Sequence, residues 1–361
     1  MPPQASHVDD GLETGLYDAV LLVSFGGPDG PDDVMPFLEN VLRGRPVPRE
    51  RMLEVAEHYH HFGGKSPINE QNRRLIAALQ AELDSRGPRL PIYWGNRNWH
   101  PLLEDTMARM AADGVRRAIA LVTSGFSCYS GCRQYRENIA SACTAAGAAA
   151  PQIDKIRVFF NHPAFVATMA ENLRVAIESL GPPGGRLPVL FTAHSIPISM
   201  AQSSRYEAQL EESSRLVAEC AGVADWRLVF QSRSGPPTQP WLEPDVCDAI
   251  RELHAAGCER LVIVPIGFVS DHMEVLYDLD TEAADLCRQL GMPMARAATA
   301  GTAPAFVGML RDLIAERHLQ LPDRPAIGKL PASHDVCPED CCPAPVGRPA
   351  GATPTGGVRP S

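Results

Sequence analysis

The sequence predicts an α/β fold built from two similar domains, each with an open parallel sheet. Short apolar runs recur along the chain, and they are continuous rather than alternating, which is typical of parallel strands buried on both faces. Amphipathic stretches separate these runs, as they do in βαβ units. The two halves of the chain also resemble each other, which indicates an internal repeat.

The elements follow from this alternation in chain order. The predicted strands are AVLLVSF (19–25), PIYWG (91–95), RAIALVTS (117–124), LPVLFTAH (187–194), RLVFQS (227–232) and RLVIVPIGFV (260–269). The predicted helices cover 68–86, 101–113, 163–180, 203–221, 244–256, 275–290 and 303–318.

The internal similarity aligns the carboxyl ends of the strands. AADGVRRAIALVTSGF (111–126) resembles HAAGCERLVIVPIGF (254–268), and VLLVSFGGP (20–28) resembles VLFTAHSIP (189–197). This register places Phe25 of the first half opposite His194 of the second. Ligands of such folds bind beyond the carboxyl ends of the strands, so we expect these segments around one cleft.

Composition excludes several classes of function. The chain has 361 residues with a net charge of −10, which argues against binding nucleic acid or an anionic membrane surface. Its longest apolar runs are about half of what a membrane-spanning helix needs, and the first residues show no signal peptide. We therefore expect a cytoplasmic monomer without an integral membrane segment.

Two polar features lie beyond predicted strands. His194 ends one strand, and the stretch SDHMEVLYDLDTEA (270–283) follows another; on a helix, Glu274, Asp278 and Glu282 stack on one face. The histidine is either structural or a proton acceptor, and the carboxylates are either a solvated helix face or a route for protons and a cation. Imidazole and carboxylate together also suit Fe²⁺.

The last part of the chain changes in composition. Residues 321–361 are rich in Pro, Gly and Ala, so we expect them to be extended or disordered unless something ties them down. Three of the ten cysteines, Cys337, Cys341 and Cys342, lie in this tail. A reducing compartment argues against disulfides. We interpret five others as small buried hydrophobic residues: Cys143, Cys220, Cys247, Cys258 and Cys287.

Several segments together resemble one known family, the ferrochelatases, which insert Fe²⁺ into a porphyrin. They are VLLVSFGGP, HFGGKSPI, YWGNRNWHPLLED, FTAHSIP, FQSRSGPPTQPWLEPDV and PIGFVSDHMEVLYDLDTE. The resemblance covers about residues 17–320. It implies the chelatase fold: two similar Rossmann-like domains with a porphyrin cleft between them and a C-terminal helix that returns to the first. The expected parts are a disordered N-terminus (1–16), a first domain (17–140 with 297–320), a second domain (141–296) and the tail (321–361).

The resemblance assigns roles to the polar features. His194 matches the active-site histidine of the family, and Glu274 matches its partner, so these two residues are expected to act in catalysis and to meet the Fe²⁺ substrate. Asp278 and Glu282 match the acidic row that leads out of the pocket. Metallation must remove two pyrrole protons, which agrees with a histidine beside carboxylates.

Further residues are expected to contact the porphyrin. Phe25, Tyr129 and Trp241 are candidates for the macrocycle faces, and Arg43, Arg45 and Ser66 for its propionates. Some bacterial members have Tyr where Phe25 stands, and Phe cannot ligate iron. The polar segment AEHYHHFGG (56–64) replaces the apolar lip of membrane-associated members, which favours coproporphyrin III over protoporphyrin IX.

Some ferrochelatases also carry a [2Fe–2S] cluster. Such a cluster needs four thiolates, and the tail supplies Cys337, Cys341 and Cys342. The resemblance places the fourth in the segment IALVTSGFSCYSGC (119–132), with Cys132 preferred and Cys128 as the alternative. Zinc bound by four cysteines, or a disordered tail with free thiols, would also fit these residues.

Two other functions remain open at this point. One is a chelatase for a different metal or macrocycle, although its relatives tend to use more histidine than the one in FTAHSIP. The other is a non-catalytic haem or iron–sulfur sensor on the same fold, although it would not need both His194 and Glu274.

Overall fold

The computed structural model describes residues 15–44, 47–182, 185–235 and 238–344. Its strands are β1 (Ala19–Ser24), β2 (Ile92–Asn96), β3 (Arg117–Val122), β4 (Gln152–Lys155), β5 (Val189–His194), β6 (Trp226–Gln231), β7 (Leu261–Val264) and β8 (Met294–Arg296). Its α-helices are α1 (Val34–Val41), α2 (Arg49–His61), α3 (Ile68–Arg86), α4 (Leu103–Ala112), α5 (Gln134–Ala146), α6 (Pro163–Ser179), α7 (Ile198–Gln202), α8 (Tyr206–Ala221), α9 (Val246–Ala255), α10 (Met273–Val275), α11 (Ala284–Gln289) and α12 (Pro304–His318).

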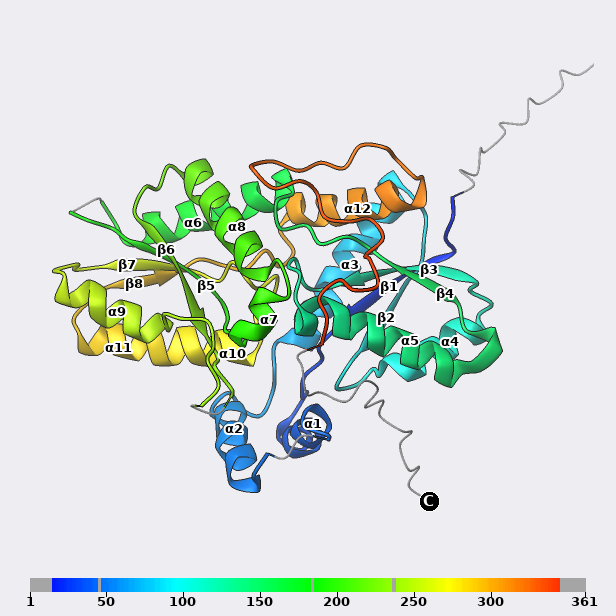
Figure 1. The fold of residues 1–361 in the computed structure, drawn as a ribbon, viewed down its shortest axis with the longest axis horizontal. Coiled ribbons are helices and arrows are strands. Elements are labelled where there is room, and N and C mark those ends of the chain that lie inside the picture. Colours follow the sequence, from blue (N-terminus) through cyan, green and yellow to red (C-terminus); the bar gives the residue numbers. More distant parts are fainter. Residues whose placement is uncertain (1–14, 45–46, 183–184, 236–237, 345–361) are drawn as a thin grey trace, which may run out of the picture.

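The strands form two parallel sheets with the same internal order. The first sheet runs β2-β1-β3-β4 and the second runs β6-β5-β7-β8, so each strand of the first half has a counterpart in the second. Figure 1 shows the sheets side by side with helices packed around each. The expectation of two similar parallel α/β units is therefore confirmed.

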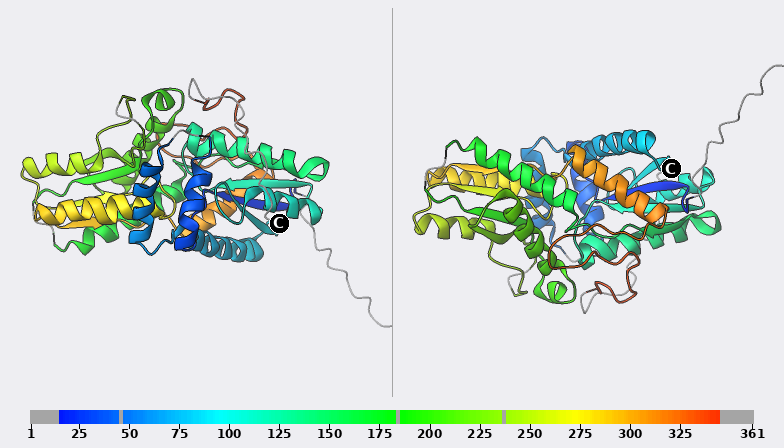
Figure 2. Two further views of the ribbon diagram at one scale, coloured as in Figure 1. Left: turned by 90° about the horizontal axis from the view of Figure 1, so that it is seen from below. Right: turned by 90° about the horizontal axis from the view of Figure 1, so that it is seen from above.

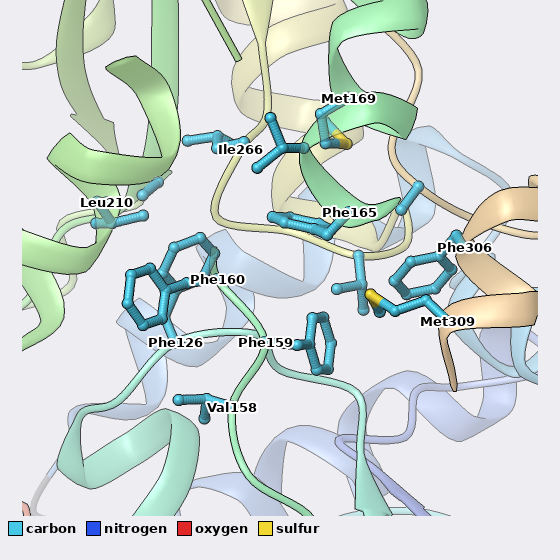
Figure 3. Close-up of a cluster of buried hydrophobic side chains, with 14 of the residues drawn as sticks. Phe126, Val158, Phe159, Phe160, Phe165, Met169, Leu210, Ile266, Phe306 and Met309 are labelled. Carbon is cyan, nitrogen blue, oxygen red and sulfur yellow. The ribbon is translucent and has the colours of Figure 1, made fainter. Parts of the chain in front are cut away.

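One buried cluster joins the two halves of the molecule. Phe126 follows β3, Phe159 and Phe160 lie in the connection between the sheets, Phe165 comes from α6, and Phe306 comes from α12. Figure 3 shows these rings meeting in one place, and all five are at most 2% exposed. The aromatic packing fixes the position of one sheet relative to the other.

Some strand boundaries differ from the expectation for physical reasons. The strand expected over 260–269 ends at Val264, because Pro265 has no N–H to donate and the chain turns there. Gly267 then runs so close to β5 that a Cβ atom on it would lie 2.6 Å from that of Ala193. The edge strands β4 and β8 lack fully buried apolar runs and were not predicted.

The pairing of β4 bears on the boundary between the domains. We expected the first domain to end at residue 140, but Gln152–Lys155 pairs with β3 in the first sheet. We therefore propose that the boundary lies after Lys155. α12 packs against α3 of the first half and α6 of the second, so it connects the two halves (Figure 2).

The tail is tied to the body by polar contacts. Arg157 and Glu316 form a buried bidentate pair, with 2.8 Å from Nε to Oε1 and 2.9 Å from Nη2 to Oε2. Arg157 also donates to the carbonyl of Pro325, and the Asn161 side chain donates to that of Leu330 at 2.7 Å. The tail is thus extended, as expected, and residues 325–331 are held by the connection between the sheets. Most of the N-terminus expected to be disordered, and the tail beyond residue 344, lie outside the described residues.

Candidate active site

His194 is presented by the last residue of the central strand β5. Its register partner on β6 is Gln231, and the Tyr206 hydroxyl donates to the His194 carbonyl at 3.1 Å, which fixes the backbone. The ring Nδ1 lies against the Ser195 carbonyl, so it is the donor nitrogen. The other ring nitrogen, Nε2, faces Glu274, with 3.7 Å to its Oε2 atom.

Glu274 lies on α10, just beyond the turn that ends β7. The His272 ring caps this helix, because its Nδ1 accepts from the Glu274 amide at 3.2 Å. The Glu274 carboxylate lies between two imidazoles, at 3.7 Å from His194 and 3.8 Å from His272. The structure therefore brings together the histidine and the glutamate that the sequence placed in different segments.

The charges of this pair are strongly coupled. Burial alone would lower the pKa of His194, but the Glu274 carboxylate, the Ser195 carbonyl and Asp278 raise it to about 9. Burial would raise the pKa of Glu274, but His194 and His272 hold it near 2. At neutral pH and without substrate, the pair is therefore an imidazolium beside a carboxylate.

The acidic row continues along a π-helical segment, η4 (Leu276–Ala283), where we expected a regular α-helix. Asp278 accepts hydrogen bonds from the Ser232 hydroxyl and from the Gln231 amide, the latter at 3.3 Å. Burial raises the pKa of Asp278 and outweighs these hydrogen bonds, which lower it, and the charges of Glu274 and Glu282 raise it further. The pKa of Asp278 is therefore raised to about 7. This carboxylate is therefore not part of a solvated face.

Glu282, the third carboxylate of the row, is more exposed. Burial raises its pKa, and the neighbouring Asp245, which caps α9, adds to the effect. Negative charge therefore extends from Glu274 toward the surface.

His194, His272 and Glu274 line a cavity of about 340 Å³ between the two halves of the molecule, within the range of about 300–1,000 Å³ that is usual for ligand sites. Of the expected porphyrin contacts, Phe25, Ser66 and Trp241 line this cavity. Arg43 is exposed near the end of α1, and Arg45 lies outside the described residues.

Tyr129, another expected porphyrin contact, does not line this cavity. Its ring is 4% exposed in the core, and its hydroxyl donates to Glu137 at 2.8 Å, so it faces away from the cavity. The aromatic wall at this place is formed instead by Tyr135 on α5. A π-helical turn, η2 (Tyr129–Arg133), separates the two tyrosines, and the sequence did not indicate which of them would face inward.

The mouth of the cavity is bordered by α2, which lies with α1 across the junction of the two halves (Figure 2). The His58 ring stacks on Tyr277 of η4, with 3.7 Å between ring centroids and an angle of 8°. The exposed side of α2 carries His60 and His61, and its Tyr59 lines the cavity. The lip is thus polar on its outer side, and it contacts the second half of the molecule.

The cysteines gather at a second cavity of about 450 Å³, which is lined by Cys132, Cys337, Cys341 and Cys342. The thiols of Cys132 and Cys337 are in hydrogen-bond contact; this contact lowers the pKa of Cys337 to about 7 against the effect of burial, and Lys155 adds to the lowering. The Arg133 guanidinium donates to the tail carbonyls of Glu339 and Cys341.

Two findings bear on whether these cysteines could bind a metal or a cluster. Within the described ranges, no three His, Cys, Asp or Glu side chains form a closed group around a metal position. Cys128, the alternative fourth ligand, lines the active-site cavity instead, where its Sγ accepts from the Gly131 amide at 3.1 Å. Cys132, the preferred ligand, is therefore the cysteine of this segment that lies beside the tail thiols.

Sequence reasoning missed several residues at the site. Gln231 and Ser232 hold Asp278, His272 caps α10, and Arg97 and Tyr135 line the cavity. All except Tyr135 occur in segments that carried the family resemblance, namely YWGNRNWHPLLED, FQSRSGPPTQPWLEPDV and PIGFVSDHMEVLYDLDTE. Their roles depend on contacts between segments, which the sequence does not show.

Comparisons with known proteins identify the family of this chain. The ferrochelatase family model matches residues 17–318. A ferrochelatase of Rhodopirellula baltica is 64% identical over 90% of this chain and 93% of its own length. A coproporphyrin III ferrochelatase of Streptomyces coelicolor is 50% identical over 95% of this chain and 98% of its own length.

Two solved structures share the fold at low sequence identity. SirB from Bacillus subtilis, solved with Fe³⁺, superposes with a TM-score of 0.51 and 13% identity over 83% of this chain and 97% of its own. A multi-domain protein of Deinococcus radiodurans with structural similarity to chelatases has the same TM-score and identity over 83% of this chain, which spans 55% of that longer protein. No helix in the described part of the chain is long and apolar enough to cross a bilayer. The family match over most of the chain, together with close relatives over nearly its full length, shows that this chain belongs to the ferrochelatase family of lyases.

Proposed function

We propose that this protein inserts Fe²⁺ into coproporphyrin III to give coprohaem in haem biosynthesis. The observation that carries the proposal is the His194–Glu274 pair inside a cavity, with an acidic row beside it. The coproporphyrin substrate is supported by the polar outer side of α2 and by relatives that are named coproporphyrin III ferrochelatases. Protoporphyrin IX, with two carboxylates instead of four, is the competing substrate.

The proposed mechanism moves protons away as iron arrives. In the substrate-free protein His194 carries a proton, because its pKa is about 9. Fe²⁺ that approaches Glu274 opposes this positive charge, so the imidazole passes its proton to the Asp278 carboxylate and from there to solvent. The freed Nε2 then accepts one pyrrole proton from the porphyrin, passes it on by the same route, and accepts the second. The electrostatic coupling of Asp278 to His194 and Glu274 supports this role. Gln231 and Ser232 hold the Asp278 carboxylate in place.

The opposite face of the macrocycle would meet Phe25, which comes from the first half, whereas Trp241 pairs with Pro197 near His194 and would contact the ring from the second half. Phe25 offers neither an oxygen nor a basic nitrogen to iron, so it cannot ligate the metal from the side opposite His194. Phe25 packs edge-on against Phe37, with 6.2 Å between centroids, which holds its ring at the cavity wall. We infer that these rings press on the macrocycle and help to distort it, which exposes the pyrrole nitrogens.

The purified protein should therefore convert coproporphyrin III and Fe²⁺ to coprohaem in the absence of oxygen. The loss of the free-base porphyrin spectrum and the gain of the metallated spectrum report the reaction. We expect many turnovers per enzyme. A rate no higher than that of porphyrin and iron without protein would exclude the proposed function.

Asp278 should give the reaction a pH dependence. Its pKa is raised to about 7, so the carboxylate that accepts protons forms only as pH rises through that value. We expect kcat/KM of the wild type to fall below pH 7, and Asp278→Asn to lower the rate and remove this limb of the profile. A mutant with the wild-type profile would contradict the relay role.

The raised pKa of Asp278 should also make the stability of the protein depend on pH. A carboxyl whose folded pKa lies above its ordinary value of 3.8 favours folding at low pH, and that contribution is lost as pH rises from about 4 to 7. The Asn side chain of Asp278→Asn is uncharged throughout this pH range, so the mutant lacks this pH-dependent contribution. The Tm of Asp278→Asn relative to wild type should therefore be higher at pH 8 than at pH 5.

The tail cysteines support a second proposal, a [2Fe–2S] cluster held by Cys132, Cys337, Cys341 and Cys342. Four thiols at one cavity match the donor number of such a cluster. The thiols form two contacting pairs, Cys132 with Cys337 and Cys341 with Cys342 (3.6 Å between Sγ atoms), so the tail must still close to bring all four around one cluster. A bound cluster would supply a structural link, because inserting Fe²⁺ is not a redox step.

We expect the wild type to be coloured and to contain iron and sulfide, and Cys132→Ser to lose both. Cys220→Ser is the control, because Cys220 is exposed and does not line that cavity. Proteolysis of Cys132→Ser should increase only beyond residue 331, since Arg157 and Asn161 hold the preceding segment. Wild type that contains one zinc and no sulfide, or Cys128→Ser that loses the iron while Cys132→Ser keeps it, would contradict this assignment.

A further inference from the structure

Arg97 reaches the active-site cavity from the loop after β2. Its backbone amide donates to the Ser24 carbonyl at 3.0 Å, which anchors the loop to the end of β1. Its guanidinium carbon lies 5.6 Å from the centroid of the Phe25 ring and 4.7 Å from that of Tyr135. Both rings line the same cavity, so the cation is held against its aromatic wall.

The guanidinium of Arg97 uses only some of its donors within the protein. It has five N–H groups; it hydrogen-bonds to the Tyr135 side chain, and Nη1 donates to the Ser130 carbonyl at a long 3.4 Å. The Nε atom is buried without a hydrogen-bond partner. Among the side chains that the structure describes, no carboxylate pairs with Arg97, whereas the Arg157 and Arg296 guanidinium groups both pair with Asp or Glu.

The two halves differ in how their cavity charges are compensated. In the second half the His194 ring faces the Glu274 carboxylate, whereas in the first half Arg97 has no carboxylate partner among the described side chains. An anionic group on a ligand would therefore be attracted toward Arg97 rather than toward Glu274. Ser130, whose carbonyl accepts from Arg97, also lines the cavity.

We propose that Arg97 binds one carboxylate of the porphyrin substrate inside the cavity and thereby favours tetracarboxylate porphyrins. This inference rests on the proposed function and names a residue that sets its substrate class. Coproporphyrin carries carboxylates around the whole ring edge, so they cannot all remain at the mouth when the macrocycle enters. Protoporphyrin has vinyl groups at two of these positions, and it leaves an inward-facing cation without a partner.

A purely structural role for Arg97 predicts a different pattern. If the guanidinium only supports the Phe25 and Tyr135 rings, its loss should disturb every porphyrin alike. If it binds a carboxylate, its loss should weaken the porphyrin with more carboxylates selectively. Measuring one Arg97 variant with both coproporphyrin III and protoporphyrin IX therefore distinguishes the two roles.

The experiment uses Arg97→Gln, Arg97→Lys and the control Arg74→Gln, whose parent residue is an exposed arginine on α3 paired with Glu70. Binding of metal-free coproporphyrin III and protoporphyrin IX is measured by fluorescence quenching, and KM and kcat by metallation. For Arg97→Gln we expect roughly 10- to 100-fold weaker binding and higher KM for coproporphyrin III, as for a lost charge-assisted hydrogen bond. Protoporphyrin IX should change much less, Lys should restore part of the loss, and the control should match wild type.

Equal losses on both porphyrins, or no loss on coproporphyrin III, would overturn the role of Arg97. The outcome is separable from that of the proposed function. Wild type that prefers protoporphyrin IX contradicts the substrate assignment, yet a selective loss of coproporphyrin binding in Arg97→Gln would still establish the carboxylate site.

Discussion

His194→Ala should abolish iron insertion while the protein still binds porphyrin. His194 supplies the ring nitrogen that faces both Glu274 and the cavity. His272, the other imidazole beside Glu274, uses its Nδ1 to accept from the Glu274 amide, and burial lowers its pKa, so it is the weaker base. A positioned general base contributes about 10²- to 10⁴-fold to a rate, and this residue is also expected to meet the iron. We therefore expect a loss at the upper end of that range.

Porphyrin binding separates loss of chemistry from loss of fold. Quenching of porphyrin fluorescence should give a Kd within a few-fold of wild type, because the cavity walls formed by Phe25 and Trp241 are unchanged. His254→Ala, at an exposed residue of α9, serves as the control and should turn over normally. Near-normal turnover of His194→Ala would remove this residue from the mechanism.

Glu274→Gln should be the second most damaging substitution. It keeps the size and hydrogen-bonding ability of the side chain, but it removes the charge that raises the pKa of His194 and that attracts the dication. We expect kcat to fall by about 10²-fold or more. Asp278→Asn and Glu282→Gln should have progressively smaller effects, because they lie farther along the row.

The graded order can be checked at fixed pH with saturating porphyrin and varied Fe²⁺. Glu259→Gln, at an exposed carboxylate outside both cavities, is the matched control. The His194 ring should also titrate at lower pH in Glu274→Gln than in wild type, which NMR can follow. Equal and negligible effects at Glu274, Asp278 and Glu282 would mean that the row is only a solvated helix face.

The sequence was a good guide where a residue's environment follows from its own segment. Central strands such as β1 and β5 are fully or almost fully buried and appear as continuous apolar runs, so their positions were predicted within two residues. The edge strands β4 and β8 are only partly buried, and no apolar run marks them. The strand around β7 was overextended because the apolar run continues past Pro265, although hydrogen bonding does not.

In the candidate site too, the sequence predicted features that depend on one segment and missed those that depend on contacts between segments. His194 and Glu274 were found because each follows a predicted strand and matches a family segment. The residues that tune them could not be found in this way, because Ser232 and Gln231 reach Asp278 from another strand. Tyr129 was chosen in place of Tyr135 because a local π-helical turn decides which ring faces the cavity.

Competition between two porphyrins in one vessel tests the central claim most directly. Wild type is given equal amounts of coproporphyrin III and protoporphyrin IX with limiting Fe²⁺ in the absence of oxygen, and the two haem products are separated and quantified. Their ratio gives the ratio of kcat/KM without separate rate measurements. The polar α2 lip and the unpaired Arg97 in the cavity predict an excess of coprohaem of about tenfold or more, as expected for one charge-assisted hydrogen bond. A product mixture dominated by protohaem would contradict the account.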